Sequence, residues 1–231
     1  HGWWWSIQTA DPGRRRLMSK FPLCVYIGLG YGHGLGYWLN SNYVDKVIGF
    51  EPVKKHFDII CAALQSNKRK NDVYLFNSAA SNIDATQKFY ITDNGVSSSL
   101  YKPTNCHIER EVQCVNLLET LTNTNWTDFL NKKDIGYIDL LIIDSQGHDF
   151  TILQNLEPLL EEKRIGRIQV EILDDNSYED SNNNFSLYEN YKPLLENYSF
   201  QTKVNGENAY QYDAVFVLKE EKNQINHRFY F

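Results

Sequence analysis

Long apolar runs, paired cysteine motifs and an excess of positive charge are all missing from this sequence. No apolar stretch approaches the roughly 20 residues that span a bilayer, and the first residues lack the charged start and apolar stretch of a signal peptide. We therefore expect a soluble, cytoplasmic protein without a membrane span. The net charge of -6 provides no overall cationic field for phosphates, which disfavours nonspecific binding of nucleic acid.

The few cysteines argue against a metal or redox site. Cys24, Cys61, Cys106 and Cys114 lie far apart, and no C-x-x-C spacing occurs among them. Neither a zinc knuckle nor a redox pair is therefore indicated. We expect four reduced thiols and predict no metal site.

The length of 231 residues suits one domain with a sizeable core. Residues 1–20 show no clear periodicity and combine Trp3–Trp5 with Arg14–Arg16. We interpret them as an aromatic and basic extension, and residues 21–231 as a single domain. The extension can stack on bases and bind phosphates, dock on a protein partner, or pack its tryptophans on the domain.

Short, continuous apolar runs alternate with helical patterns along most of the domain. Such runs are typical of strands buried on both faces of a parallel sheet. Predicted strands cover residues 23–28, 46–51, 72–79, 137–144 and 167–173, and predicted helices cover 34–42, 54–66, 117–130, 150–162 and 187–196. Repeated strand and helix units predict an α/β fold with a doubly wound, mostly parallel, Rossmann-like sheet.

The last part of the sequence does not continue the alternation of strand and helix patterns. Two closely spaced strand patterns, 198–204 and 210–219, predict an antiparallel hairpin that completes a sheet of about seven strands. Between the third and fourth strands, residues 86–92 and 111–117 alternate as edge strands do, with GVSSSL (95–100) as the loop between them. We expect this insertion to lie over the top of the sheet.

A glycine-rich turn, VYIGLGYGHG (25–34), follows the first strand. In a doubly wound sheet this turn lets the backbone approach a ligand closely. His33 stands where the dinucleotide fingerprint G-x-G-x-x-G needs its last glycine, and no G-x-x-x-x-G-K-[ST] occurs. The spacing of Gly28, Gly30 and Gly32 resembles motif I of S-adenosylmethionine-dependent methyltransferases. Glu51 ends the second strand, where a carboxylate accepts hydrogen bonds from both ribose hydroxyls.

Several further motifs resemble the FkbM-type methyltransferases in order and spacing. They are GFEP (49–52), NSAAS (77–81), GVSSSL (95–100), VQCVNLLETL (112–121), IDLLIIDSQGHDFTIL (138–153) and RIQVEI (167–172). The resemblance implies the class I methyltransferase fold, S-adenosyl-L-methionine as the cofactor, and transfer of a methyl group to a hydroxyl of a glycan or small molecule. It places Ser78 and Ala79 near the adenine. Segments 85–112 and 174–190 are expected to shape the acceptor pocket.

Three positions differ from the family pattern. Tyr26 replaces an acid before the glycine turn, Ile142 replaces a lysine, and Gln146 replaces a glutamate, whereas Asp144 and Gly147 are kept. Asp144 ends the fourth strand and suits a general base, a ligand of a divalent ion or a cofactor anchor.

Histidines supply further candidates for the catalytic base. His148 can accept a proton from an attacking hydroxyl, or simply begin a helix near Asp149. His33, in the glycine turn, is another candidate.

Three functions remain open at this stage. The first is a hydroxyl methyltransferase with Asp144 and His148 at the acceptor. The second is a catalytically degenerate binding or assembly subunit, in which Tyr26 fills part of the cofactor space. The third is a methyltransferase for an RNA cap ribose, with residues 1–20 as the RNA contact.

Overall fold

The computed structural model describes residues 21–93, 95, 97–104, 107–173, 178, 188–205 and 211–219. The predicted extension, residues 1–20, and most of segment 174–190 lie outside these residues. None of the described helices has the length and apolar content that a membrane crossing requires.

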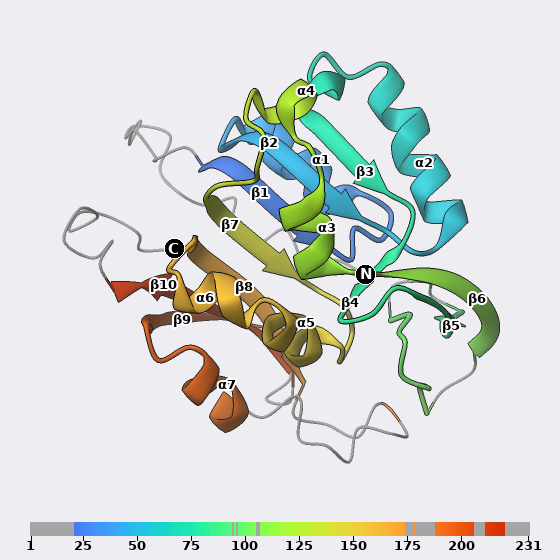
Figure 1. Ribbon diagram of the computed structural model, residues 1–231. Coiled ribbons are helices and arrows are strands. Elements are labelled where there is room, and N and C mark those ends of the chain that lie inside the picture. Colours follow the sequence, from blue (N-terminus) through green and yellow to red (C-terminus); the bar gives the residue numbers. More distant parts are fainter. Residues whose placement is uncertain are drawn as a thin grey trace, which may run out of the picture.

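A seven-stranded sheet forms the centre of the fold (Figure 1). Its parallel strands are β1 (Phe21–Ile27), β2 (Val44–Phe50), β3 (Val73–Phe76), β7 (Ile138–Ile143) and β8 (Ile165–Leu173). β9 (Tyr198–Asn205) and β10 (Gln211–Leu218) are antiparallel to each other, and β10 is antiparallel to β8. The order β3-β2-β1-β7-β8-β10-β9 confirms a doubly wound sheet that ends in an antiparallel hairpin.

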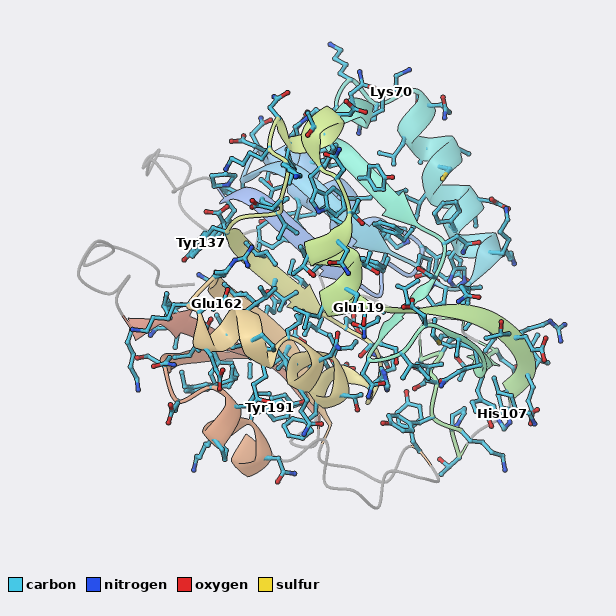
Figure 2. All side chains as sticks on the ribbon, in the orientation of Figure 1. Lys70, His107, Glu119, Tyr137, Glu162 and Tyr191 are labelled. Atoms are coloured by element: carbon cyan, nitrogen blue, oxygen red, sulfur yellow. The ribbon has the colours of Figure 1, made fainter. Side chains whose placement is uncertain are left out.

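Helices cover both faces of this sheet. α1 (His33–Ser41) and α2 (Lys54–Gln65) pack on one face, where Leu35 and Ile60 join Cys24 and Leu140 in one core cluster. α3 (Leu117–Asn123), α5 (Asp149–Asn155), α6 (Glu157–Glu161) and α7 (Tyr188–Leu194) pack on the other. Figure 2 labels Tyr191 of α7, whose buried ring lies edge-on to a ring of α5 at 5.1 Å. The two helical layers bury the apolar strands, as the continuous apolar runs predict.

The insertion between β3 and β7 forms a second, three-stranded sheet from β4 (Ala79–Ser81), β5 (Ala85–Thr92) and β6 (His107–Asn116). The prediction of two edge strands is wrong for β6, which lies between β4 and β5. The predicted strand 72–79 is also divided, and β3 and β4 belong to different sheets. At the break, the Asn77 amide donates to the backbone carbonyl of Glu51 at 2.9 Å, which anchors the chain where it changes sheets.

Two predicted helices are each broken into two. The predicted helix 117–130 becomes α3 and α4 (Thr127–Leu130), because Trp126 buries its indole between them and donates to the carbonyl of Leu121. The predicted helix 150–162 becomes α5 and α6. A proline stands in the first turn of α6. Helices tolerate proline there but not in their interior, so a new helix begins at this point.

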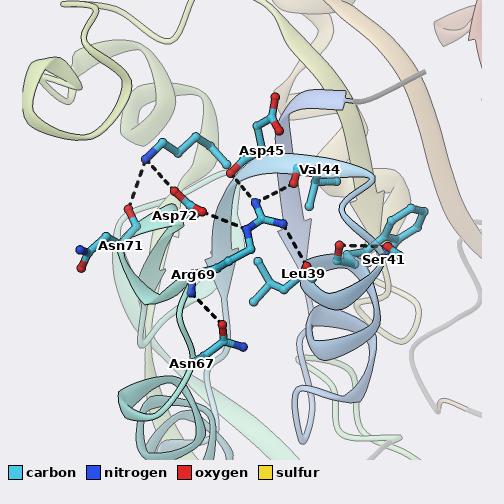
Figure 3. Close-up of polar contacts among 10 residues, drawn as sticks. Leu39, Ser41, Val44, Asp45, Asn67, Arg69, Asn71 and Asp72 are labelled. Atoms are coloured by element: carbon cyan, nitrogen blue, oxygen red, sulfur yellow. Dashed lines mark hydrogen bonds and ion pairs between the residues drawn. The ribbon is translucent and has the colours of Figure 1, made fainter. Parts of the chain in front are cut away.

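Arg69 ties the first two strand and helix units together (Figure 3). Its guanidinium donates to the backbone carbonyls of Leu39, Val44 and Asp45 and to the carboxylate of Asp72, at 2.7–3.0 Å. It therefore satisfies carbonyls at the end of α1 and at the start of β2, where the helix itself provides no donors. This network lies at the opposite end of β2 from Glu51 and fixes the frame behind the site.

Candidate functional site

A cavity of about 630 Å³ opens at the carboxyl ends of β1, β2, β3 and β7, a volume typical of small-molecule sites. The predicted residues that line it are Gly28, Gly30, His33, Glu51, Ser78, Ala79, Asp144 and His148. Gly32 lies outside the lining and precedes α1 with a φ of 81°. The predicted insertion also lines the cavity, through Phe89, Gly95, Ser98 and Leu100.

Gly28 and Asp144 lie where β1 and β7 diverge, at the point where the strand order reverses. The Asp144 amide donates to the carbonyl of Ile27 at 3.1 Å. A Cβ on Gly28 would come within 1.8 Å of the Asp144 carbonyl oxygen, and the φ of Gly28 is 80°. Only glycine fits there, because both the contact and the backbone angle exclude a side chain. Ligands of doubly wound sheets bind at this switch point.

Glu51 holds the glycine turn in place from the end of β2. Its Oε2 accepts from the Gly30 amide at 2.7 Å, and its Oε1 accepts from the Val53 amide at 2.8 Å. The side chain is 3% exposed and lines the cavity. A carboxylate has about four acceptor positions, so two remain for hydroxyls of a ligand.

Next to Glu51, a histidine and a tyrosine close one end of the cavity. His56 Nδ1 lies 3.6 Å from Glu51 Oε1, and the His56 ring packs on Tyr31 at 4.1 Å. A Cβ on Gly95 would lie 2.8 Å from the Tyr31 hydroxyl. The β5–β6 loop therefore contacts both the glycine turn and α2.

A pair of carboxylates, half-buried Asp144 and buried Glu171, lies beside the cavity. The Gln146 amide donates to Asp144 Oδ1 and to Glu171 Oε2, each at 2.8 Å, and its oxygen accepts from the Tyr178 hydroxyl at 3.2 Å. Burial raises the pKa of Asp144, the charge of Glu51 raises it further, and the bond from Gln146 opposes this shift. A neutral amide thus bridges two carboxylates, where a glutamate would add a third negative charge.

His148 directly precedes α5 and lines the cavity. Its Nε2 lies 3.0 Å from Ser81 Oγ, whereas its buried Nδ1 has no hydrogen-bond partner among the described residues. The side chain is 8% exposed, and burial lowers the pKa of His148 to about 4. The ring is therefore neutral at pH 7, with one of its nitrogens able to accept a proton.

Ser78 is the second buried group with an unsatisfied polar atom at the cavity. Its Oγ has no hydrogen-bond partner among the described residues, and the residue is only 4% exposed. A buried hydroxyl without a partner costs free energy unless a ligand or water completes it. Val53, Ala79 and Phe89 belong to one apolar cluster, and all three line the cavity beside Ser78.

Tyr26 does not fill the cavity. Its ring packs with Leu35 and Ile142 beneath α1, and a Cβ on Gly34 would come within 2.3 Å of its hydroxyl. Burial and the nearby Asp144 raise the pKa of Tyr26, which keeps the phenol neutral. The cavity keeps its volume of about 630 Å³ with Tyr26 as part of the wall.

Sequence reasoning missed Glu171, Ser81 and the bridging role of Gln146. Glu171 had a visible signal, since an acid in the apolar strand RIQVEIL needs a buried partner. Ser81 had none, because its contact with His148 joins residues 67 positions apart. Within the described residues, no group of three or more His, Cys, Asp and Glu side chains lies in a metal-binding arrangement. Cys24, Cys61 and Cys114 are free thiols.

The strand order and the cavity at its switch point define a class I methyltransferase fold. Among solved structures, the methyltransferase FkbM from Methylobacillus flagellatus KT matches 89% of this chain and 45% of its own, at 10% identity and a TM-score of 0.54. TrmK of M. capricolum, in complex with S-adenosyl-homocysteine, matches 88% of this chain and 64% of its own, at 13% identity and a TM-score of 0.48. The chain thus spans less than half the length of the solved FkbM chain.

Sequence comparison is more specific. The methyltransferase FkbM domain profile matches residues 36–202, well over half of the chain. Comparison with curated protein sequences finds no match. The chain belongs to the FkbM methyltransferase domain family.

Proposed function

We propose that this protein is an S-adenosylmethionine-dependent O-methyltransferase that methylates a hydroxyl of a glycan or small molecule. The observation that carries the proposal is one cavity whose lining combines the glycine turn (Gly28 and Gly30) and Glu51 with Asp144 and His148. A transferase of this kind needs cofactor-binding and acceptor-binding groups in one cavity, because cofactor and acceptor must meet within contact distance. Membership of the FkbM family supports the same activity.

The residues present fit the cofactor. Glu51 keeps acceptor positions for the two ribose hydroxyls, and Gly28 and Gly30 leave room beside the turn. Ser78 has a free hydroxyl next to the apolar wall of Ala79 and Phe89, where the adenine would lie. The carboxylates of Glu51 and Asp144 suit a ligand with a positively charged sulfur.

The chain's own residues position the acceptor and handle one proton. When bound, S-adenosylmethionine supplies an activated methyl group, which leaves its electron pair on sulfur as the acceptor oxygen takes the methyl. The acceptor hydroxyl must lose its proton, and His148 Nδ1 or the Asp144 carboxylate receives it. The β5–β6 insertion excludes water from the cavity at Phe89 and Leu100.

Calorimetric titration of the full chain with S-adenosylmethionine and S-adenosylhomocysteine tests the cofactor assignment, after mass spectrometry has excluded ligand carried through purification. We expect micromolar binding. Glu51→Gln should weaken it about 10- to 100-fold, because a lost charge-assisted hydrogen bond costs about 1.5–3 kcal/mol. Glu161→Gln, on the exposed side of α6, is the matched control and should bind as the wild type does. A folded, ligand-free wild type that binds neither compound would refute the proposal.

Two other functions find less support. The degenerate-subunit hypothesis was motivated by Tyr26, Ile142 and Gln146. Tyr26 packs with Leu35 and is part of the cavity wall, and a cavity of about 630 Å³ is present beside it. The RNA hypothesis rested on Trp3–Trp5 and Arg14–Arg16, which lie outside the described residues. An acceptor screen over sugar, lipid and RNA hydroxyls, read as S-adenosylhomocysteine released, decides among acceptors.

A further inference from the structure

We propose that Ser81 is a positioning residue that holds His148 as the Nε2–H tautomer, so that the Nδ1 lone pair is left to accept the substrate hydroxyl's proton. This inference rests on the proposed function and assigns the base within it. Its basis is the set of contacts around two buried side chains, Ser81 at 1% exposure and His148 at 8%.

The hydrogen-bond inventory decides the tautomer. Ser81 Oγ has one proton and two polar neighbours, His148 Nε2 at 3.0 Å and Asn82 Oδ1 at 3.3 Å. Asn82 Oδ1 can only accept, so the Ser81 proton goes to it. Ser81 Oγ then accepts from Nε2, which must carry the ring proton. This arrangement satisfies every donor in the group.

The opposite arrangement leaves a buried donor without a partner. If Ser81 donated to Nε2, the ring proton would sit on Nδ1, which has no hydrogen-bond partner among the described residues. A buried N–H without an acceptor is destabilising, because it loses its bond to water and gains none in return. In the Nε2–H tautomer, Nδ1 carries a lone pair instead of a proton, and a ligand hydroxyl can donate a hydrogen bond to it.

The geometry suits proton transfer to a neutral ring. His148 lines the same cavity as Asp144 and the glycine turn. As the acceptor oxygen gains the methyl group, its hydroxyl becomes strongly acidic, and the O–H bond breaks as the N–H bond forms on Nδ1. Even a weakly basic nitrogen suffices for this step, and the resulting imidazolium returns its proton to solvent. Asp144 Oδ1 is meanwhile engaged by Gln146, which favours His148 as the base.

Nitrogen NMR on the full chain tests the tautomer without any cofactor. The protonated and unprotonated ring nitrogens resonate far apart, and the spectrum of His148→Gln identifies the signals of His148 among the six histidines. In the wild type at pH 7, we expect the proton on Nε2, with a hydrogen-bonded, slowly exchanging N–H. Ser81→Ala should lose this protection and move toward the tautomer mixture of a free imidazole, whereas Ser81→Thr keeps the hydroxyl and the protection. A wild-type Nδ1–H tautomer would overturn the proposal.

Kinetics test what the tautomer does. With an acceptor from the hydroxyl screen, Ser81→Ala should lower kcat on the order of 10-fold and leave the KM for S-adenosylmethionine unchanged, and Ser81→Thr should restore kcat. An unchanged kcat in Ser81→Ala would overturn the proposal even if the tautomer is as expected. If the wild type binds no S-adenosylmethionine, the proposed function itself fails, and calorimetry shows that separately from the NMR result.

Discussion

Replacement of Gln146 tests whether its side-chain amide stabilises the folded protein by bridging the carboxylates of Asp144 and Glu171. The amide makes two bonds of 2.8 Å, to Asp144 and to Glu171. Hydrogen bonds to charged groups contribute about 1.5–3 kcal/mol each, so their joint loss in Gln146→Glu should lower the free energy of unfolding by about 3 kcal/mol at pH 8. For a chain of this size, that corresponds to a melting temperature about 6–12 °C lower.

The pH dependence of this loss identifies its cause. Three neighbouring carboxyls raise one another's pKa in the folded protein, so the folded state binds more protons than the unfolded state near neutral pH. The stability of Gln146→Glu should therefore rise as the pH falls from 8 to 5, and approach the wild type at pH 5, because the bound protons restore O–H···O bonds. Gln146→Leu brings no exchangeable proton and should recover less.

Urea unfolding at pH 5 and pH 8 measures both effects, with the difference from wild type taken at each pH so that shared titrations cancel. Gln154→Glu, on the exposed side of α5, is the matched control and should stay within about 0.5 kcal/mol of wild type. An equal loss at both pH values for Gln146→Glu would refute the electrostatic reasoning. A loss below about 0.5 kcal/mol at pH 8 would show that the bridge contributes nothing.

Two further substitutions test the frame around the site. Arg69→Met should cost about 3 kcal/mol in urea unfolding, since it leaves three backbone carbonyls without their donor, whereas Lys54→Met removes only an exposed ion pair and should cost less than about 0.5 kcal/mol. Similar losses for both would contradict the role of Arg69. Gly28→Ala should abolish the fold or the cofactor site, because its Cβ would overlap the Asp144 carbonyl, whereas Gly30→Ala meets no atom within 4 Å and should cost about 1–2 kcal/mol of backbone strain. Equal stability of the two variants would argue against the close approach of β1 and β7.

The sheet could be predicted from local patterns, whereas the break points could not. Strands such as Val44–Phe50 are buried on both faces, and their continuous apolar letters show this directly. The break between β3 and β4 depends on the Asn77 amide reaching a backbone carbonyl 26 positions earlier, and the break after α3 depends on where the Trp126 indole is buried. Tertiary contacts decide both, and no short window contains them.

The candidate site likewise has residues that the sequence predicted and contacts that it did not. Glycine spacing and an acid at a strand end predicted Gly28, Gly30 and Glu51 at the cavity, because these residues act through the backbone of their own turn. The bridge from Gln146 to Glu171 and the contact of Ser81 with His148 join residues 25 and 67 positions apart in the sequence, so only the folded chain reveals them. A substitution judged alone, such as glutamine for glutamate, gives no indication that its partner is a carboxylate on the next strand.

Tyr26 and Ile142, two positions that differ from the family pattern, lie side by side beneath α1. Tyr26 and Ile142 are cross-strand partners on β1 and β7, so an acid and a lysine at these positions would face each other as an ion pair. Replacing one alone would leave a buried, unpaired charge, which costs several kcal/mol, whereas replacing both by an apolar contact is tolerated. Gly34 provides the space for the larger phenol, because a Cβ there would overlap the Tyr26 hydroxyl. The three residues therefore pack together at α1, and Glu51 and Asp144 still line the cavity.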